Sequence, residues 1–219
     1  EDRPSKRERK SAEAEGRGEG FMQLYKQKEE QQVELIDRIL ESENIEAAIR
    51  AVERNQGAPG IDKKPVRLLR TYFSEHGREI REEIREKKYE PQSVRRVYIP
   101  KANGKMRGLG IPSFEDKVVQ GVFKEILEAI YEPKFKEFSF GFRPGKDCHD
   151  AIQRVNKHIM ADKVNYIVDA DIKGFFDNID HDWMIKFLEH DIADKNFIRY
   201  IKRFISRSEE RRVGKECRS

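Results

Sequence analysis

The sequence has no long apolar run. Hydrophobic residues make up 37% of its 219 residues, and no stretch approaches the roughly 20 apolar residues that a membrane-spanning helix needs. Its charged N terminus also has no apolar core of the kind that a secretion signal requires. We therefore expect neither a membrane protein nor a secreted one.

Cysteine and histidine are both scarce. The two cysteines, Cys148 and Cys217, lie far apart in the sequence, and the five histidines are scattered without the spacing of a metal motif. This usage argues against a disulfide framework and against a structural zinc module. It is typical of a protein that works in the reducing cytoplasm, which is where we expect this one.

Charged residues are abundant, at 39%, but their two signs nearly cancel to a net charge of +4. Their distribution is uneven. Residues 81–107 hold nine Lys or Arg and four Asp or Glu, a local charge of +5 that exceeds the charge of the whole chain. Such a basic stretch is typical of surfaces that hold phosphates. A solvated helix face has the same composition, so charge alone does not decide between the two interpretations.

Apolar periodicity predicts mostly helices with a few strands. Residues 1–20 are charged, with almost no large apolar side chain, which predicts a disordered lead-in. Alternating apolar residues on either side of 101–105 predict a β-hairpin, and those in 164–171 predict a further strand. Helical spacing recurs in 21–54, 65–88, 113–131, 147–161, 182–190 and 195–205. The pattern indicates an α+β or α/β architecture.

The segment Asp169–Ile179 is the most informative, because it places Asp171 at the end of the predicted strand. A buried carboxylate is costly to leave ionised without a partner. A hard cation such as Mg²⁺ offsets that cost, and two such ions can assist phosphoryl transfer. The segment thus indicates half of a nucleotidyl-transfer site. Taken alone, it is explained at least as well by acids that cap the next helix and phenylalanines that fill the core.

Four blocks of sequence change that balance: 55–62 (NQGAPGID), 96–112, 132–135 with 139–144, and 171–181. In this order they resemble the N-terminal extension motif, the fingers hairpin, the next fingers block and palm motif A of group II intron-encoded reverse transcriptases. The resemblance runs from about Leu35 to Ile205. It implies a right-hand polymerase with fingers and a partial palm, helix-rich with a β-hairpin and a short palm sheet. It also implies RNA-directed DNA polymerase activity in the parent protein.

The resemblance assigns roles to the palm residues. Asp171 matches the first metal-binding, catalytic aspartate, and the carbonyl of Ile172 would be a second Mg²⁺ ligand. Phe176 matches the residue that lies under the sugar of the incoming nucleotide. Gly174 and Phe175 would offer backbone amides near its triphosphate.

In the fingers, Lys101 and Arg107 match the cations that grip the incoming dNTP, and Arg is suited to holding phosphate oxygens bidentately. The alternative is that they only keep the hairpin hydrated. Asp169 could join the metal site or tune local charge. Arg143 could contact template or phosphate, or pair with a buried carboxylate. His181 fits a helix start better than a catalytic role.

The resemblance also sets boundaries and exposes departures. It implies N-terminal extension helices in 21–64 after the lead-in, fingers in 65–163, partial palm in 164–205 and a disordered, non-homologous tail in 206–219. Gly108 stands where the family usually has proline. The Tyr-Ala-Asp-Asp-like turn that supplies further catalytic carboxylates is not in the sequence. We therefore expect the 219-residue chain itself to be inactive as a polymerase.

The implied partners are an intron RNA template, a DNA primer or target, dNTPs and Mg²⁺; the sequence does not indicate an oligomeric state. An alternative from another class is an RNA-binding maturase that helps intron RNA fold and splice, and the basic 81–107 stretch fits it. Retron, diversity-generating and CRISPR-associated reverse transcriptases are further alternatives with the same fold.

Overall fold

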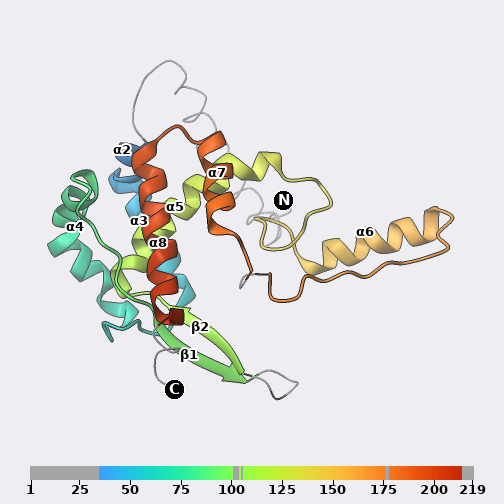
Figure 1. The fold of residues 1–219 in the computed structure, drawn as a ribbon, viewed down its shortest axis with the longest axis horizontal. Helices are drawn as coiled ribbons and strands as arrows, with labels where there is room; N and C mark the ends of the chain where they lie inside the picture. Colours follow the sequence, from blue (N-terminus) through green and yellow to red (C-terminus); the bar gives the residue numbers. More distant parts are fainter. Residues whose placement is uncertain (1–34, 101–103, 105, 176–177, 214–219) are drawn as a thin grey trace, which may run out of the picture. The chain divides into compact units, whose positions relative to one another are not determined.

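The computed structural model describes residues 35–100, 104, 106–175 and 178–213 (Figure 1). Its regular elements, in chain order, are α2 (Leu35–Ile39), α3 (Ser42–Asn55), η1 (Val66–Leu68), α4 (Leu69–Arg85), β1 (Arg95–Pro100), β2 (Met106–Ile111), α5 (Phe114–Tyr131), η2 (Glu132–Lys134), α6 (Cys148–Ala161), α7 (His181–Asp191) and α8 (Lys195–Val213). The described chain is thus helix-rich with one two-stranded antiparallel sheet. None of its helices combines the length and the apolar character needed to cross a membrane.

The described chain forms two compact units. One comprises residues 125–178, and the other comprises residues 33–124 together with 179–219, within the described ranges. Helix α5 begins in the second unit and ends in the first. These divisions differ from the boundaries predicted at 64/65 and 163/164, which follow the subdomains of the family and stay predictions.

The core of the larger unit is an aromatic cluster between α5 and α8. The ring of Phe123 lies 4.9 Å from that of Phe197, 5.7 Å from that of Tyr200 and 5.3 Å from that of Phe204. Phe197 and Tyr200 are completely buried. The Tyr200 hydroxyl also donates to the carbonyl of Ile84 (2.9 Å), so that the buried polar atom is satisfied while α8 is joined to the end of α4.

A buried carboxylate joins the two ends of the hairpin to α5. Asp116, only 1% exposed, accepts hydrogen bonds from the Tyr89 hydroxyl (2.7 Å), the Gln92 backbone amide (3.0 Å) and the Ser113 hydroxyl (2.6 Å). Burial raises the pKa of the Asp116 carboxyl, whereas the bonds from Ser113 and Tyr89 act in the opposite direction. Tyr89 and Gln92 precede β1 and Ser113 follows β2, so one side chain fixes the base of the hairpin.

The 55–62 segment packs against the same base. A Cβ on Gly60 would overlap the Pro112 carbonyl oxygen and lie 2.6 Å from Ser113 Cα, so only glycine allows this approach of two backbones. Asp62 then accepts a hydrogen bond from the Phe114 amide (2.9 Å). Because this amide belongs to the first turn of α5, it has no partner within the helix.

The predicted hairpin is confirmed. β1 and β2 pair antiparallel in the register Arg95↔Ile111 through Pro100↔Met106. Figure 1 shows the two strands extending together from the helices of their unit. Most of the tip, residues 101–103 and 105, lies outside the described residues, but Gly104 has φ +75°, as expected in a tight turn.

The predicted strand over 164–171, and with it the short palm sheet, is wrong for the described residues. This segment has no regular structure, and the sheet contains β1 and β2 alone. Side chains that should alternate between two faces are exposed together, as Tyr166, Ile167 and Val168 show. A strand needs a neighbour for its backbone hydrogen bonds, and no described strand pairs with this segment.

The prediction of a disordered tail from residue 206 is also wrong in part, since α8 continues to Val213. The segment has no apolar period, but Glu and Arg are good helix formers. Extension of an existing helix also avoids the cost of nucleating a new one. Residues 214–219 lie outside the described residues.

We expect Asp116→Asn to lower the free energy of unfolding by about 1–3 kcal/mol, because an amide NH₂ replaces one of the two oxygens that together accept hydrogen bonds from three donors. Chemical denaturation followed by circular dichroism measures the change. Asp169→Asn, an exposed carboxylate, is the control and should leave stability unchanged. Equal stability of Asp116→Asn and wild type would show that the carboxylate is not needed at the base of the hairpin.

We expect Gly60→Ala to destabilise the chain by about 1–3 kcal/mol, because its new methyl group meets backbone that cannot move away. Gly57→Ala is a matched control in the same segment: its Cβ would lie 4.0 Å from Lys117 Nζ, in ordinary contact. Thermal denaturation of the two variants side by side tests the prediction. Equal melting temperatures would contradict it.

Candidate functional site

Two cations were predicted in the fingers, Lys101 and Arg107. Arg107 lies on β2 opposite Ile99 and is exposed. Lys101 lies outside the described residues. Partners in an antiparallel pair point to the same side of a sheet. Val97, Ile99 and Leu109 therefore share a face with Arg107. That face places an exposed guanidinium next to apolar side chains near the end of the hairpin, an arrangement that can hold both a phosphate and the edge of a sugar or base.

The other face of the hairpin holds Tyr98 opposite Gly108. A Cβ on Gly108 would lie 3.5 Å from the Tyr98 ring, in ordinary contact. Position 108, where the resemblance leads us to expect proline, has no side chain. The Tyr98 ring therefore lies next to the backbone of Gly108. Because the β1–β2 register continues through Gly108 without a bulge, the substitution has not broken the hairpin.

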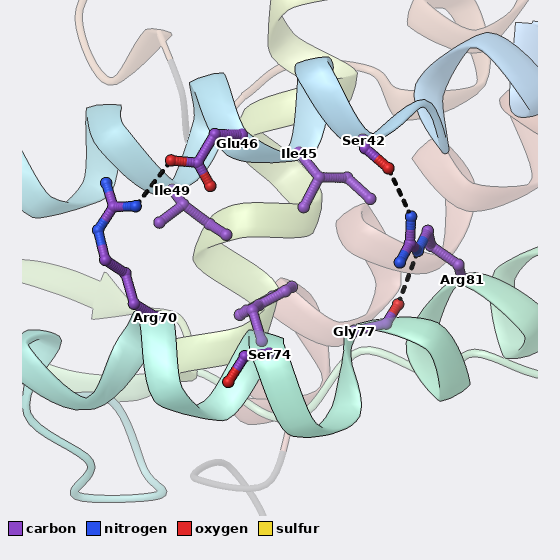
Figure 2. Close-up of a pocket in the computed structure, with 9 residues that line it drawn as sticks. Ser42, Ile45, Glu46, Ile49, Arg70, Ser74, Gly77 and Arg81 are labelled. Carbon is purple, nitrogen blue, oxygen red and sulfur yellow. Dashed lines mark hydrogen bonds and ion pairs between the residues drawn. The ribbon is translucent and has the colours of Figure 1, made fainter.

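A groove of about 340 Å³ lies between α3 and α4 (Figure 2). At one end Arg70 pairs with Glu46 (2.7 Å) and Glu53 (2.8 Å). At the other end Arg81 donates to Ser42 Oγ (2.9 Å) and to the Gly77 carbonyl (3.0 Å). Figure 2 shows the Arg70–Glu46 and Arg81–Ser42 bonds joining the two helices, with Ile45 and Ile49 of α3 between them. The guanidinium of Arg70 is already paired with two carboxylates. Its role is therefore to join the helices, and the groove is not a phosphate-binding site.

Asp171 lies in the exposed segment that follows α6, two residues after the exposed Asp169. The smaller unit contains this segment, whereas the larger unit contains the hairpin. Ile172 is exposed as well. The predicted metal-site residues are therefore accessible to solvent in their own unit, and their relation to Arg107 stays a prediction.

A tight turn follows Asp171. Gly174 has φ +63°, and its carbonyl accepts hydrogen bonds from both the side-chain amide (2.8 Å) and the backbone amide (3.1 Å) of Asn178. A side chain at position 174 would be strained by this backbone conformation. Phe175 is half-exposed directly after the turn, and Phe176 lies outside the described residues.

The donor atoms at Asp171 and Ile172 fit a hard divalent cation, because both a carboxylate and a carbonyl supply oxygen. Among the described residues no three His, Cys, Asp or Glu side chains gather in the manner of a metal site. The described chain thus supplies ligands of the right chemical type but only part of a coordination shell.

Arg143, for which the sequence left two interpretations open, pairs with a carboxylate. Its guanidinium donates to Glu132 Oε1 from Nε (2.9 Å) and Nη2 (2.6 Å), and to the carbonyls of Lys136 (2.8 Å) and Ser139 (3.1 Å) from Nη1. The side chain is only 10% exposed. It therefore closes the 132–143 loop and is not available to a template phosphate.

Sequence reasoning missed the network around Asp116, although a signal was present: Ser113 and Asp116 are spaced as in a capping box. The structure adds the reciprocal bond, in which the Asp116 amide donates to Ser113 Oγ (3.2 Å). The interpretation of His181 as a helix start is confirmed. It is the first residue of α7, and Asp180 caps that helix by accepting from the Trp183 amide (3.0 Å).

Comparison with known families identifies the class of protein. The sequence model of the family "Reverse transcriptase (RNA-dependent DNA polymerase)" matches residues 99–218, which is more than half of the chain. The match includes the second hairpin strand, the segment with Asp171 and α8. This chain belongs to the reverse transcriptase family.

Individual relatives indicate which type of reverse transcriptase the chain resembles. Group II intron-encoded protein LtrA of Lactococcus lactis subsp. cremoris is 42% identical over 135 residues, which are 61% of this chain and 22% of that protein. Protein YkfC of Escherichia coli (strain K12) is 32% identical over 169 residues, 75% of this chain and 44% of that protein. Nuclear intron maturase 2, mitochondrial, of Arabidopsis thaliana is 34% identical over 89 residues, 41% and 12% respectively. The chain spans less than half the length of each, and the names support the group II intron type.

We expect Arg143→Lys to loosen the 132–143 loop, because a lysine cannot make the guanidinium's bonds to both Glu132 and the loop carbonyls. Amide hydrogen exchange in the loop should become faster by roughly 10-fold. Arg154→Lys is the matched control, since Arg154 makes only a long, exposed ion pair with Glu137 (3.9 Å) in the same unit. Unchanged loop exchange in Arg143→Lys would refute the assigned role.

Proposed function

We propose that this chain forms the fingers and the first part of the palm of a group II intron-type reverse transcriptase, which copies RNA into DNA from dNTPs. The match of more than half the chain to the reverse transcriptase family carries the proposal. The hairpin with an exposed Arg107 and the accessible Asp171 segment support it, because each has the chemistry that the resemblance assigns to it.

In this proposal, residues of the fingers hairpin and of the motif A segment each have a role toward the incoming nucleotide. Arg107 and Lys101 bind the triphosphate, where a guanidinium can contact two oxygens at once. Phe176 lies under the sugar, and the amides of Gly174 and Phe175 face the phosphates. The primer 3′-hydroxyl attacks the α-phosphate in line, its proton is lost and pyrophosphate leaves.

Asp171 and the Ile172 carbonyl would hold a divalent cation, which we propose to be Mg²⁺. When bound, Mg²⁺ would stabilise the negative charge that develops on the reacting phosphate. The role of the chain is to place a hard carboxylate next to the turn at Gly174. The partners in this proposal are an intron RNA template and a DNA primer or target.

A second candidate function is intron RNA binding of the maturase type. The name of the Arabidopsis relative favours it, as does the charge of +5 over residues 81–107. In the structure this stretch includes the end of α4, the tether of Tyr89 to Asp116 and the whole of β1. Arg95 and Arg96 lie on a strand whose base is fixed, and phosphates can bind such cations without a catalytic metal. Arg85 and Lys88 of the same stretch already pair with Asp37 and Glu86.

The catalytic proposal is tested by replacing the homologous segment of LtrA with residues 35–205 of this chain. We expect the chimaera to extend a DNA primer on an RNA template with Mg²⁺ and dNTPs. Asp171→Asn should lower primer extension by at least about 10³-fold, because it removes a carboxylate ligand of the metal ion that would stabilise the charge of the transition state. The 219-residue chain alone should not extend the primer.

Asp169→Asn in the same chimaera is the control, with activity expected near that of the parent. RNA affinity, measured by filter binding, should be the same for Asp171→Asn and its parent. An active Asp171→Asn chimaera would sink the assignment of the metal ligand. Loss of RNA affinity together with activity would make Asp171 a structural residue.

A further inference from the structure

Residues 163–171 form an exposed, largely apolar segment in the smaller unit. Tyr166, Ile167 and Val168 are 90%, 73% and 88% exposed. Figure 1 shows the segment as an extended trace that turns back after α6. The described sheet contains only β1 and β2, so no described strand pairs with it. An extended run whose edge is unpaired is a template for pairing with another chain.

Helix α6 adds a second exposed apolar surface to the same unit. Ile152, Val155 and Ile159 are 64%, 55% and 42% exposed. Their spacing of three and four residues places them on one face of the helix. A two-stranded ribbon is marginally stable by itself and gains stability when a helix packs against its apolar face. The unit therefore carries both an extended segment that lacks a described partner strand and the kind of helix face that a ribbon needs.

The charge of the segment argues against a nucleic acid as its partner. Residues 162–172 hold one Lys and three Asp, a charge of −2, which repels a polyanion. The order of the charges suits a second copy of the chain. Lys163 lies at one end, whereas Asp169 and Asp171 lie at the other. Asp162 is next to Lys163, but its carboxylate is already hydrogen-bonded to the His158 ring (2.7 Å). Two antiparallel copies therefore bring the lysine of each to the aspartates of the other.

One register of this antiparallel pair matches both the charges and the apolar pattern. Centred on Ile167, it places Lys163 of each copy opposite Asp171 of the other. A shift of one residue would instead set Val164 opposite Asp169, so the alternation selects the centred register. In that register one face of the ribbon contains only apolar residues, because alternate side chains point to the same side: Val164, Tyr166, Val168 and Ala170.

We propose that two copies of the 219-residue chain associate through residues 163–171, paired antiparallel about Ile167, with the apolar face of α6 from each copy covering the ribbon. The same surface of both copies forms the contact, so the dimer is symmetric and closed. The inference goes beyond the proposed function, because it concerns how this chain associates with itself. In the dimer Asp171 faces a lysine, so the associated chain does not offer this carboxylate to a metal ion.

Charge reversal tests the register. Sedimentation equilibrium of the 219-residue chain should show monomers in equilibrium with dimers. Lys163→Glu sets like charges opposite each other twice in every dimer, so the dimer dissociation constant should rise by roughly 10-fold. Asp171→Lys should raise it similarly. An equimolar mixture of the two variants should return close to the parent's constant, because both contacts of the mixed dimer join opposite charges. Both residues are exposed, so neither melting temperature should change.

Cysteine cross-linking tests the centre of the pair. With Cys148 and Cys217 replaced by serine, Ile167→Cys should form a disulfide between copies, because directly opposite Cα atoms lie about 4.5–5.5 Å apart. Ile172→Cys is the matched control. Ile172 is similarly exposed, at 68%, but it lies five residues from the centre, so its two copies are too far apart to be joined.

A monomer at every concentration would overturn the inference. Unchanged dimerisation of both charge variants, failure of their mixture to restore the dimer, or equal cross-linking of Ile172→Cys would overturn it too. A monomer that binds an RNA oligonucleotide, with affinity lost in Lys163→Glu, would overturn it in favour of nucleic acid.

The dimer and the polymerase assignment can fail separately. An inactive LtrA chimaera together with the Ile167→Cys cross-link would leave the dimer standing. An active chimaera together with a monomeric 219-residue chain would leave only the polymerase assignment.

Discussion

The carboxylate of Asp116 is the contact on which the geometry of the hairpin depends. It is buried, which raises the pKa of its carboxyl, and three donors from two chain segments converge on its oxygens. Those segments lead into β1 and out of β2. Gly60 and Asp62 add the N-terminal extension to the same point. Any cation on the hairpin is therefore placed by a network at its base, about a strand's length away.

Local patterns predicted the elements whose partners are also local. The hairpin and the helices α4 to α8 were all expected from periodicity, since a turn or an apolar face is enough to define them. The strand over 164–171 was expected on the same grounds and did not form among the described residues. Alternation reports that a segment suits a pleated sheet, but not whether a neighbouring strand is present to pair with it. The motif A segment with Asp171 is therefore exposed.

The residues of the candidate site also differ in how far the sequence could predict them. Resemblance alone proposed Asp171, Ile172 and Arg107, and all three residues are exposed in the structure. Sequence reasoning left Arg143 open, because a lone arginine in a loop fits a phosphate as well as a carboxylate. The fold decides between them, because it brings Glu132, eleven residues away, and two backbone carbonyls to the guanidinium.

The positions of the buried and exposed groups fit a division of labour between scaffold and binding surface. Asp116, Tyr89 and Arg143 are charged or polar groups in the interior, and each is held by two or more hydrogen bonds, so they fix backbone and offer little to a ligand. Arg107 and Asp171 are exposed in segments that Asp116 or a tight turn holds in shape. A cation and a carboxylate are complementary to a phosphate and to a metal ion. Both chemistries are needed for the nucleotidyl transfer that we propose.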